Sequence, residues 1–420
     1  MLTGDDDGDL GPRERATSRR WVAALLLPLL VAAEWELRRR GDAAAVSGAP
    51  DWAVLLEIAV FLGVGALLVL GLRPRRSPRT RVPQLLVLLW VVVGVQAVSA
   101  VWSPYPSLSV VRAAQLLVVA GLAHAVATRA TREALHVAMH GLLVLTLVAV
   151  GLGLALDFPA YTILQEGRFT WLYVHPVQAG VWFSVALVVA VAYAATSGVA
   201  RSGPRWSRAA YALVALVFLT SLLATLARGA VAAGLLGSVV VLWAGAPRSR
   251  RVDLLAALAL ASSTLVAVLG GRLLEAAARG QSAEELATLN YRTRLWGLAA
   301  DRLAEHPLFG YGLGASRGLF LEETGLGGGH NAFVDLAVNS GLVGLLLSLA
   351  LVGATAVTLR RLPRADPAVR ADRPLLAGLL VALVVSGTTN ESVGAPATMA
   401  GALLLVVVAW TSVLRRGTAS

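Results

Sequence analysis

The chain has 420 residues, of which 57% are hydrophobic and 15% are charged, and its mean hydropathy is +0.72. Soluble globular proteins are less hydrophobic, so this composition indicates an integral membrane protein. The formal net charge of +11 does not indicate nucleic-acid binding, because the arginines lie in small clusters between apolar runs, where they orient a membrane protein. The absence of cysteine excludes disulfides, thiolate metal sites and a cysteine nucleophile.

Apolar runs long enough to cross a bilayer recur along the chain, since a transmembrane helix takes about 20 apolar residues. The first run contains Pro28 and ends near Glu34, and we interpret it as an uncleaved anchor in place of an export signal. Twelve transmembrane helices are predicted, at residues 21–37, 52–72, 83–102, 107–127, 134–156, 174–197, 208–226, 229–245, 253–271, 333–359, 374–390 and 396–414.

The distribution of arginine between the loops predicts the orientation of these helices. With the amino terminus in the cytoplasm, the cytoplasmic loops and tails hold 24 arginines and the outer loops hold 11. This excess follows the positive-inside rule, so both termini are expected in the cytoplasm. The cluster from Arg38 to Arg40 falls on the outer side against the rule. If the first segment lay along the membrane surface, only the amino-terminal tail would change sides.

The predicted spans divide the chain into five parts. These are a disordered cytoplasmic tail (1–20), a transmembrane bundle of nine spans (21–271), a large extracytoplasmic loop (272–332), three further spans (333–414) and a short cytoplasmic tail (415–420). A structured loop of about sixty residues usually carries binding or catalysis. A short surface helix is expected within residues 273–289. The functional groups are therefore expected on the outer side of the cytoplasmic membrane.

His330 is the first candidate for a chemical role. It follows a glycine-rich run that begins at Gly325, and it precedes Asn331 and an apolar helix. Histidine titrates near neutral pH and accepts a proton from a sugar hydroxyl, while neighbouring glycines let a bulky substrate approach the backbone. The alternative is a structural role at the start of the helix, with Asn331 as its cap.

Several arginines are predicted on the same outer side. Arg228 lies in a tight turn between two apolar segments, where its guanidinium can bind phosphate oxygens in bidentate fashion. The alternatives are a snorkelling arginine for Arg228 and solvated loop charges for Arg292 and Arg294. Arg168 stands in another outer loop shortly before His175. Together these residues predict an anion site, and a diphosphate is the anion expected at a membrane surface.

Three further features of the sequence bear on the same site. Arg112 lies near the outer end of a span and is expected to contribute, because a charge inside the membrane is costly and often functional. His136 and His140 have the i, i+4 spacing of a metal pair, but no third ligand is near them in sequence, so no metal site is predicted. The glycine run that begins at Gly310 does not have the nucleotide-binding spacing. No cofactor is expected.

Four motifs together resemble one family signature. They are an arginine four residues before an aromatic residue (Arg292, Trp296), the His-Pro-Leu-x-Gly-x-Gly-x-Gly run (His306 to Gly314), His-Asn (His330, Asn331) and Gly-x-x-Gly-Leu (Gly341 to Leu345). Over residues 160–350 the chain resembles the O-antigen ligase and O-antigen polymerase superfamily, polytopic enzymes that act on polyprenyl-diphosphate-linked glycans. Two positions depart from the pattern: His175 replaces the usual asparagine, and Asn339 stands where an acidic residue is common.

The resemblance implies a fold, a reaction and residue roles. The expected fold is an all-α integral membrane protein, GT-C-like, with about twelve transmembrane helices and one long structured extracytoplasmic loop. The expected reaction is metal-independent transfer of a glycan from a polyprenyl-diphosphate carrier to a hydroxyl of a glycan or lipid acceptor. His330, Arg228 and Arg292 are expected to be catalytic. The residues expected to bind substrate are Arg168, Asn331, Arg294, His175 and Arg112.

The sequence leaves alternatives open. Within the superfamily, it does not separate a polymerase that joins repeat units from a ligase that moves a finished polymer. Outside the superfamily, the same arginines could recognise a lipid diphosphate in a transporter or flippase, which would be expected to carry polar residues at mid-membrane. A third alternative is a non-catalytic subunit of a glycan assembly complex. The expected partners are the lipid-linked donor, the acceptor and membrane lipids, with no nucleic acid.

Overall fold

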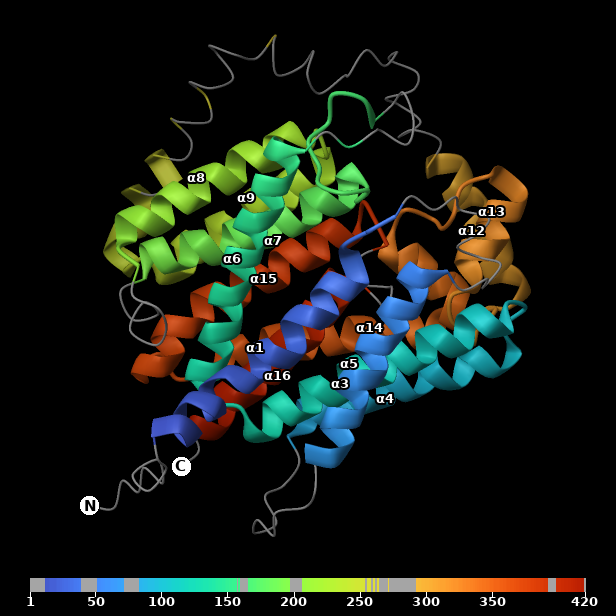
Figure 1. The fold of residues 1–420 in the computed structure, drawn as a ribbon, viewed down its shortest axis with the longest axis horizontal. Helices are drawn as coiled ribbons and strands as arrows, with labels where there is room; N and C mark the ends of the chain where they lie inside the picture. The colour runs from blue at the N-terminus through green and yellow to red at the C-terminus, as the bar shows by residue number, and fades with distance from the viewer. Residues whose placement is uncertain are drawn as a thin grey trace.

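The structure, a computed structural model, describes residues 12–38, 51–71, 83–156, 158, 165–196, 206–253, 292–391 and 398–418, with a few isolated positions between 255 and 271. In this part of the chain the regular elements are helices, without a strand, which confirms the all-α prediction (Figure 1). The helices are α1 (Pro12–Glu34), α3 (Trp52–Gly71), α4 (Gln84–Ser99), η2 (Ala100–Trp102), α5 (Pro106–Arg129), α6 (Arg132–Ala155), α7 (Pro176–Ala195), α8 (Arg208–Ala224), α9 (Arg228–Gly245), η5 (Arg248–Arg250), α12 (Arg292–Glu305), α13 (Ala315–Thr324), α14 (Ala332–Arg361), α15 (Pro367–Gly387) and α16 (Met399–Gly417).

Among the described residues, eight helices are long and apolar enough to cross a membrane: α3, α4 with η2, α5, α6, α7, α9, α14 and α16. Helix α8 is apolar but has 17 residues, and α15 carries Arg370, Asp372 and Arg373 near its start. The predicted ninth span, 253–271, lies mostly outside the described residues. The chain is therefore a multi-pass membrane protein, and the count of twelve spans stays a prediction.

The amino-terminal tail differs from its prediction. Residues 12–20 were expected to be disordered, but α1 begins at Pro12, and only residues 1–11 of the predicted tail lie outside the described residues. Proline suits the first turn of a helix, because its φ is already helical and its missing N–H would have no helical partner. The arginine, glutamate and alanine residues that follow have high helix propensity.

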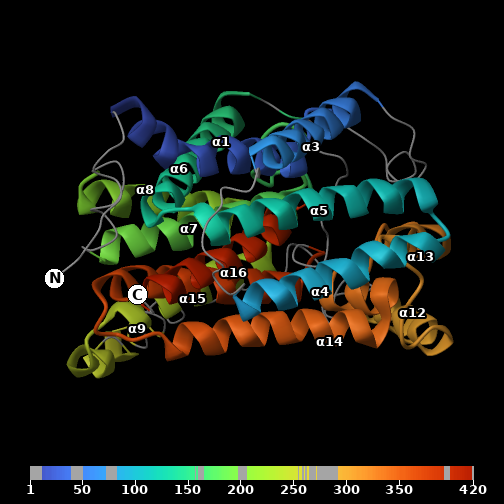
Figure 2. The ribbon, with the colours of Figure 1, turned by 90° about the horizontal axis from the view of Figure 1, so that it is seen from below.

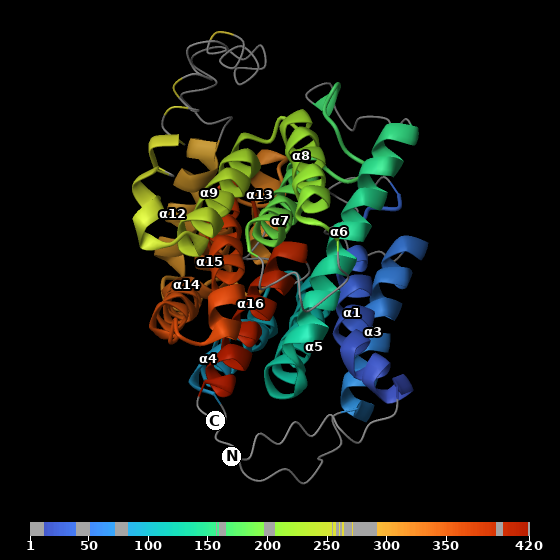
Figure 3. The ribbon, with the colours of Figure 1, turned by 90° about the vertical axis from the view of Figure 1, so that its left-hand side faces the viewer.

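Small residues let α7, α9 and α15 pack closely (Figure 3). A Cβ added at Gly237 of α9 would lie 2.8 Å from the carbonyl oxygen of Gly378 in α15. One added at Gly180 of α7 would lie 2.8 Å from the Cβ of Ala227, just before α9. Helices in membranes associate through such close contacts, because lipid gives them no hydrophobic driving force. This packing fixes the beginning of α9 relative to the end of α15.

The two ends of the molecule differ. The beginning of α1 and the end of α16 lie at one end, and the short helices α12 and α13 lie at the opposite end, beside the start of α14 (Figure 2). Of the predicted 272–332 loop, residues 292–332 are described and contain α12 and α13. Residues 272–291, with the whole of the predicted surface helix, lie outside the described residues. The extent of the loop stays a prediction.

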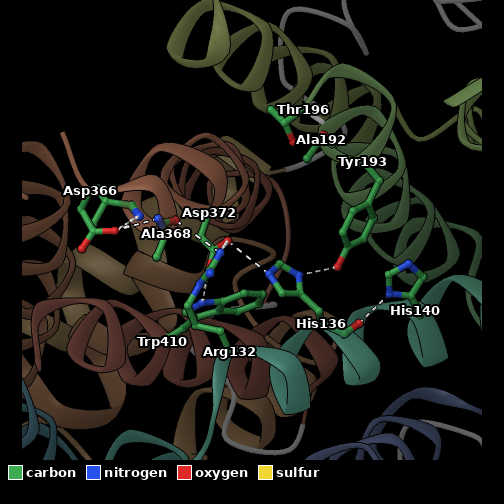
Figure 4. A network of polar contacts seen from close by, with 11 residues as sticks. Arg132, His136, His140, Ala192, Tyr193, Thr196, Asp366, Ala368, Asp372 and Trp410 are labelled. Atoms are coloured by element: carbon green, nitrogen blue, oxygen red, sulfur yellow. Dashed lines mark hydrogen bonds and ion pairs between the residues drawn. The ribbon is translucent and has the colours of Figure 1, made fainter. Parts of the chain in front are cut away.

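A buried polar network crosses the interior of the bundle (Figure 4). Arg132 Nε donates to Asp372 Oδ2 at 2.8 Å, and Trp410 Nε1 donates to the same oxygen at 3.0 Å. His136 Nε2 donates to Asp372 Oδ1 at 3.1 Å, so its Nδ1 accepts from the Tyr193 hydroxyl at 2.9 Å. These contacts join α6, α7, α15 and α16. They also pair the buried Asp372 carboxylate, because an unpaired charge in the interior would be costly.

The second histidine of this pair has separate partners. His140 Nδ1 donates to the His136 carbonyl oxygen at 2.7 Å, and its Nε2 accepts from the Tyr211 hydroxyl at 2.6 Å. Both ring nitrogens of each histidine are therefore engaged by protein groups. No cluster of three potential metal ligands occurs among the described residues. The i, i+4 spacing places both imidazoles on one face of α6, where they bind tyrosine hydroxyls of α7 and α8.

Candidate functional site

Helix α14 is broken at Gly341, which belongs to the Gly-x-x-Gly-Leu motif. Gly341 has φ 63° and ψ −168°, a conformation that is essentially restricted to glycine. The break removes the helical bonds from the N–H groups of Leu342 and Val343 to the carbonyls of Val338 and Asn339. Four backbone groups at this point would lose their helical partners unless another segment supplied new ones.

The His-Pro-Leu-x-Gly-x-Gly-x-Gly run supplies those partners. Its backbone makes four hydrogen bonds with the groups freed at the break: Leu342 N to Pro307 O (2.8 Å), Val343 N to Leu308 O (3.2 Å), Tyr311 N to Val338 O (2.9 Å) and Gly312 N to Asn339 O (2.8 Å). Two motifs that are about thirty residues apart in sequence therefore form one junction.

The glycines of the run permit this close approach. A Cβ at Gly310 would lie 2.6 Å from the Gly341 nitrogen, and one at Gly312 would lie 2.7 Å from Ser103 Cα, so larger residues would not fit. Both glycines also have positive φ. The prediction that this run is not a nucleotide-binding loop agrees with these contacts, because the glycines face protein backbone.

Asn339 connects this junction to α13. Its Oδ1 accepts a hydrogen bond from Ser316 N at 2.7 Å, in the first turn of α13. A carboxylate at position 339 would offer the same kind of acceptor. Asparagine can therefore replace the common acidic residue without loss of the hydrogen bond from Ser316 N. A small apolar cluster of Leu295, Ala299, Phe320 and Val338 joins α12, α13 and α14 beside it.

The loop before α14 holds His330 in an uncommon conformation. His330 has φ 51°, in the left-handed region, and its side chain is half-buried. Asn331 caps α14, since its Oδ1 accepts from Phe333 N at 3.0 Å and from Val334 N at 3.4 Å. The capping alternative considered for Asn331 is therefore what the structure shows, and its role in binding substrate stays a prediction.

His175 caps α7 in a similar way. Its Nδ1 accepts a hydrogen bond from Val177 N at 3.1 Å, which is the role that the usual asparagine would take. Burial, together with the nearby charges of Arg168 and His330, lowers the pKa of His175 to about 4. These three side chains, predicted separately from two outer loops, therefore lie within electrostatic reach of one another.

Arg168 also stabilises the turn that leads to Arg228. Its Nε donates to the carbonyl oxygen of Thr225 at 2.8 Å, and the next residue, Phe169, donates its N–H to Ala224 O at 2.9 Å. The turn between α8 and α9 is tight, as predicted, and contains Leu226 at φ 52°. This contact places the Arg168 loop directly against the segment that ends at Arg228.

Arg228 and Arg292 come together although they lie 64 positions apart. Arg228 is exposed at the first position of α9, and Arg292 is half-buried at the first position of α12. Burial lowers the pKa of Arg292, and the charge of Arg228 lowers it further. Two guanidinium groups that repel one another in this way form a region where an anion is favoured.

The end of α15 connects these arginines to the His330 loop. Gly229, next to Arg228, packs against the Thr389 side chain so closely that a Cβ would overlap it. The following residue, Asn390, accepts a hydrogen bond through its carbonyl oxygen from Ala332 N at 2.9 Å. Arg228 and His330 therefore flank the same segment at the same end of the bundle.

Four helices begin around this segment: α7, α9, α12 and α14. The amino terminus of a helix carries a partial positive charge and unpaired N–H groups. Arginine is unfavourable at such a position unless an anion compensates it, yet Arg228 and Arg292 occupy two of these termini. The helix ends and the guanidinium groups together make this end of the molecule electropositive.

Two other predicted site residues have surroundings of a different kind. Arg294 is two residues beyond Arg292, about 200° around the helix, and its side chain is exposed. Arg112 Nη1 donates to Gln115 Oε1 at 2.9 Å and lies 3.7 Å from the Glu57 carboxylate, within α3 and α5. The structure thus groups Arg112 with two intramembrane polar residues. Substrate binding by Arg294 and Arg112 stays a prediction without a geometric argument in its favour.

Three residues at the site were missed by sequence reasoning. Asp335 Oδ1 accepts from Gly329 N at 2.8 Å, Trp296 Nε1 donates to Gly329 O at 3.1 Å, and Glu391 packs against Gly328. Trp296 was quoted only as part of the signature. A carboxylate in the first turn of an apolar helix was a usable signal for Asp335. Glu391 was hidden because the predicted span reached residue 390, whereas α15 ends at Gly387.

An apolar cavity lies between α4, α5, α14 and α16. Phe333 and Leu336 of the first turns of α14 line one part of it, and Ser348 and Val352 line another part of the same helix. Gln96 donates to the Ser348 hydroxyl at 3.3 Å across it. The cavity therefore starts within one helical turn of Asn331 and extends along the bundle.

The fold and this site define a multi-pass helical membrane protein whose candidate site gathers at helix amino termini. The family model described as O-Antigen ligase matches residues 212–349, which include Arg228, Arg292 and His330. No curated protein matches the chain. This match confirms the resemblance to the O-antigen ligase and polymerase superfamily. This family indicates a membrane glycosyltransferase-type enzyme that uses lipid-linked glycans.

Proposed function

We propose that this protein transfers a glycan from a polyprenyl-diphosphate carrier to an acceptor hydroxyl, without a metal, at the outer face of the cytoplasmic membrane. The observation that carries the proposal is the convergence of Arg228 and Arg292, at two helix amino termini, with the His330 loop on the other side of the α15 end. All three residues fall within the matched O-antigen ligase domain.

The two arginines act on the leaving group. When the bond from the anomeric carbon to the phosphate oxygen breaks, the diphosphate departs with the electron pair and gains negative charge. Guanidinium groups bind phosphate oxygens in bidentate fashion, and Arg228 and Arg292 are already fixed at helix ends that favour an anion. Such preorganised charge lowers the barrier, because no reorganisation is needed as the negative charge develops.

His330 acts on the acceptor. As the acceptor oxygen forms its bond to the anomeric carbon, its proton passes to the imidazole of His330. The activated glycosyl diphosphate supplies the driving force, so the reaction requires neither ATP nor another nucleotide. His175 lies near His330, and its low pKa keeps it neutral near pH 7, so it serves α7 as a cap without adding a further positive charge.

The apolar cavity supports a lipid-linked donor. It begins beside Phe333, three residues after His330, and it is lined mainly by aliphatic side chains of α4, α5, α14 and α16. A polyprenyl carrier has its charged diphosphate next to a long hydrocarbon chain. The neighbouring positions of the electropositive site and the cavity suit these two parts of one molecule.

The arginine distribution supports the proposed side of the membrane. Arg228 and His330 both lie in predicted outer segments, whereas the arginine-rich loops 73–81 and 360–373 lie on the other side in the positive-inside assignment. The contacts at the end of α15 are consistent with that common side. Accessibility of a cysteine introduced at Glu391 to an impermeant reagent in intact cells tests this assignment.

The proposed reaction is tested with purified protein in lipid nanodiscs and a synthetic polyprenyl-diphosphate glycan. We expect His330→Ala to lower the transfer rate by about 10²–10⁴-fold, the usual contribution of a general base. Arg228→Ala is expected to lower it by about 10²–10³-fold, as for other charge-stabilising groups. Arg302→Gln, at a half-buried arginine on α12 that pairs with Glu305 and Glu323, is the control and is expected to keep wild-type activity.

The variants must remain folded, which thermal unfolding in the same nanodiscs establishes. Full transfer activity in folded His330→Ala or folded Arg228→Ala would refute the proposed site. Movement of the lipid-linked glycan across the bilayer without transfer to an acceptor would favour the transporter alternative.

Surface polysaccharide from a deletion strain separates the two activities of the superfamily. Single units without chain extension indicate a polymerase, because repeat units would then be made but not joined. Full-length lipid-linked chains without attachment indicate a ligase. Unchanged polysaccharide in that strain would contradict both activities.

A further inference from the structure

The residue proposed to move the proton is held in an unusual backbone conformation. His330 has φ 51°, where residues with a side chain are uncommon, although histidine is among those that tolerate it. A residue keeps such a conformation only where the surrounding structure fixes it. The contacts on either side of His330 therefore identify the groups that set the position of its imidazole.

Both backbone polar groups of the preceding residue are bound by side chains. Gly329 donates its N–H to Asp335 Oδ1 at 2.8 Å, and its carbonyl oxygen accepts from Trp296 Nε1 at 3.1 Å. Asp335 belongs to α14 and is 4% exposed, and Trp296 belongs to α12. The two peptide units that flank the Gly329 Cα are thus each held by a side chain, one from α14 and one from α12.

The following residues are fixed as well. Asn331 caps α14 with its side chain, and Ala332 donates its N–H to the carbonyl oxygen of Asn390 at 2.9 Å. With the backbone held on both sides, the direction in which the His330 side chain leaves the chain is set. Reactions that depend on a positioned group lose rate when that group moves by as little as about 1 Å.

We propose that Trp296 and Asp335 are positioning residues, which hold Gly329 so that His330 keeps its left-handed conformation and its imidazole stays fixed relative to Arg228 and Arg292. This inference rests on the proposed function for its effect on transfer. A purely structural role for Asp335, as an acidic group at the amino terminus of α14, would stabilise the helix without altering the conformation of His330.

Single substitutions separate these roles. Trp296→Phe removes the Nε1 donor and keeps an aromatic ring, Asp335→Ala removes the acceptor, and Asp335→Asn keeps an oxygen that can accept from Gly329. We expect the first two to lower kcat by about 10–100-fold, with KM for the donor unchanged, because the group is displaced while substrate binding remains. Asp335→Asn is expected to restore kcat to within about threefold of wild type. Trp243→Phe, on α9 beside Arg251, is the matched control and leaves kcat unchanged.

A spectroscopic measurement makes the test independent of activity. The chain has six histidines, so carbon-13 labelling of histidine gives few Cα and Cβ signals, and His330→Gln identifies the signal of His330. We expect a left-handed shift pattern in the wild type and in Asp335→Asn, and its loss in folded Trp296→Phe. If Asp335→Ala does not fold, Trp296→Phe still decides the outcome.

The inference is overturned if folded Trp296→Phe keeps both the wild-type signal of His330 and the wild-type kcat. Normal transfer by His330→Gln would instead refute the proposed function. In that case a changed His330 signal in Trp296→Phe would still support the inference that Trp296 holds the backbone before His330.

Discussion

At the scale of single residues, the site uses side chains for two purposes. Asn331, His175 and Arg168 hold the backbone of their own loops, by capping helices or by binding a carbonyl. Arg228 and Arg292 instead repel one another at two helix starts, an arrangement that gains stability when an anion is bound. The loop-holding contacts are therefore separate from the charge that the two arginines are proposed to supply to the diphosphate.

His175 gives a prediction for stability against pH. Its pKa is about 4 in the folded protein, compared with about 6.5 in an unfolded chain, so the unfolded state binds more protons between these values. The contribution of neutral His175 to the free energy of unfolding is therefore fully present above pH 6.5, and it is lost as the pH falls towards 4. We expect the melting temperature of the wild type to fall by about 2 °C or more between pH 7 and pH 5.

The matched variant for this measurement is His175→Asn, which keeps a cap on α7 but does not titrate. Its melting temperature at pH 7 is expected to match the wild type, and its decrease towards pH 5 is expected to be smaller. An equal decrease in both proteins would show that His175 is not the group responsible.

At the scale of elements, the break in α14 and the glycine-rich run form one structure. The N–H and carbonyl groups released at Gly341 are bound by the backbone of residues 307–312. This exchange explains why glycines recur in both motifs: each backbone must come within hydrogen-bonding distance of the other. The junction in turn fixes α12, and with it Arg292 and Trp296, against α14.

Gly341→Ala tests this junction. The conformation at Gly341 is essentially restricted to glycine, and an added Cβ would overlap the carbonyl of Leu308. We expect the free energy of unfolding in detergent micelles to fall by at least about 2 kcal/mol.

Gly353→Ala provides the control on the same helix. No atom lies within 4 Å of a Cβ added at Gly353, and alanine has the higher helix propensity. Its unfolding free energy is expected to stay within about 1 kcal/mol of wild type, with a change towards greater stability. Similar losses in the two variants would contradict the role of Gly341 in the junction.

At the scale of the whole molecule, composition was sufficient to predict the class of fold. Length, hydropathy and the spacing of apolar runs predicted an all-helical multi-pass membrane protein, and α3, α5 and α9 lie within one or two residues of their predicted ranges. The helical start at Pro12 was missed, because acidic and arginine-rich residues were interpreted as a disordered tail. Charged residues do not indicate disorder where helix propensity and a first-turn proline favour a helix.

The candidate site was predictable only in part. The residues that carry charge in outer loops, such as Arg228 and His330, stood out against an apolar background. Contacts formed by tertiary packing leave no such signal in the sequence. The hydrogen bonds of Trp296 and Asp335 to Gly329, and the contact of Glu391 with Gly328, were therefore not expected. Spacing within a helix also distinguishes Arg294 from Arg292, because two residues correspond to about 200° of rotation.

The central claim is that Arg228 and Arg292 act together on one diphosphate, and a double-mutant cycle of glycan transfer in nanodiscs tests it most directly. We predict that Arg228→Gln and Arg292→Gln each lower kcat/KM by about 10²–10³-fold, and that the double variant loses much less than the product of the two effects, because residues that act as a unit are not additive. Wild-type transfer in either folded single variant, or strictly multiplicative losses in the double variant, would contradict the account.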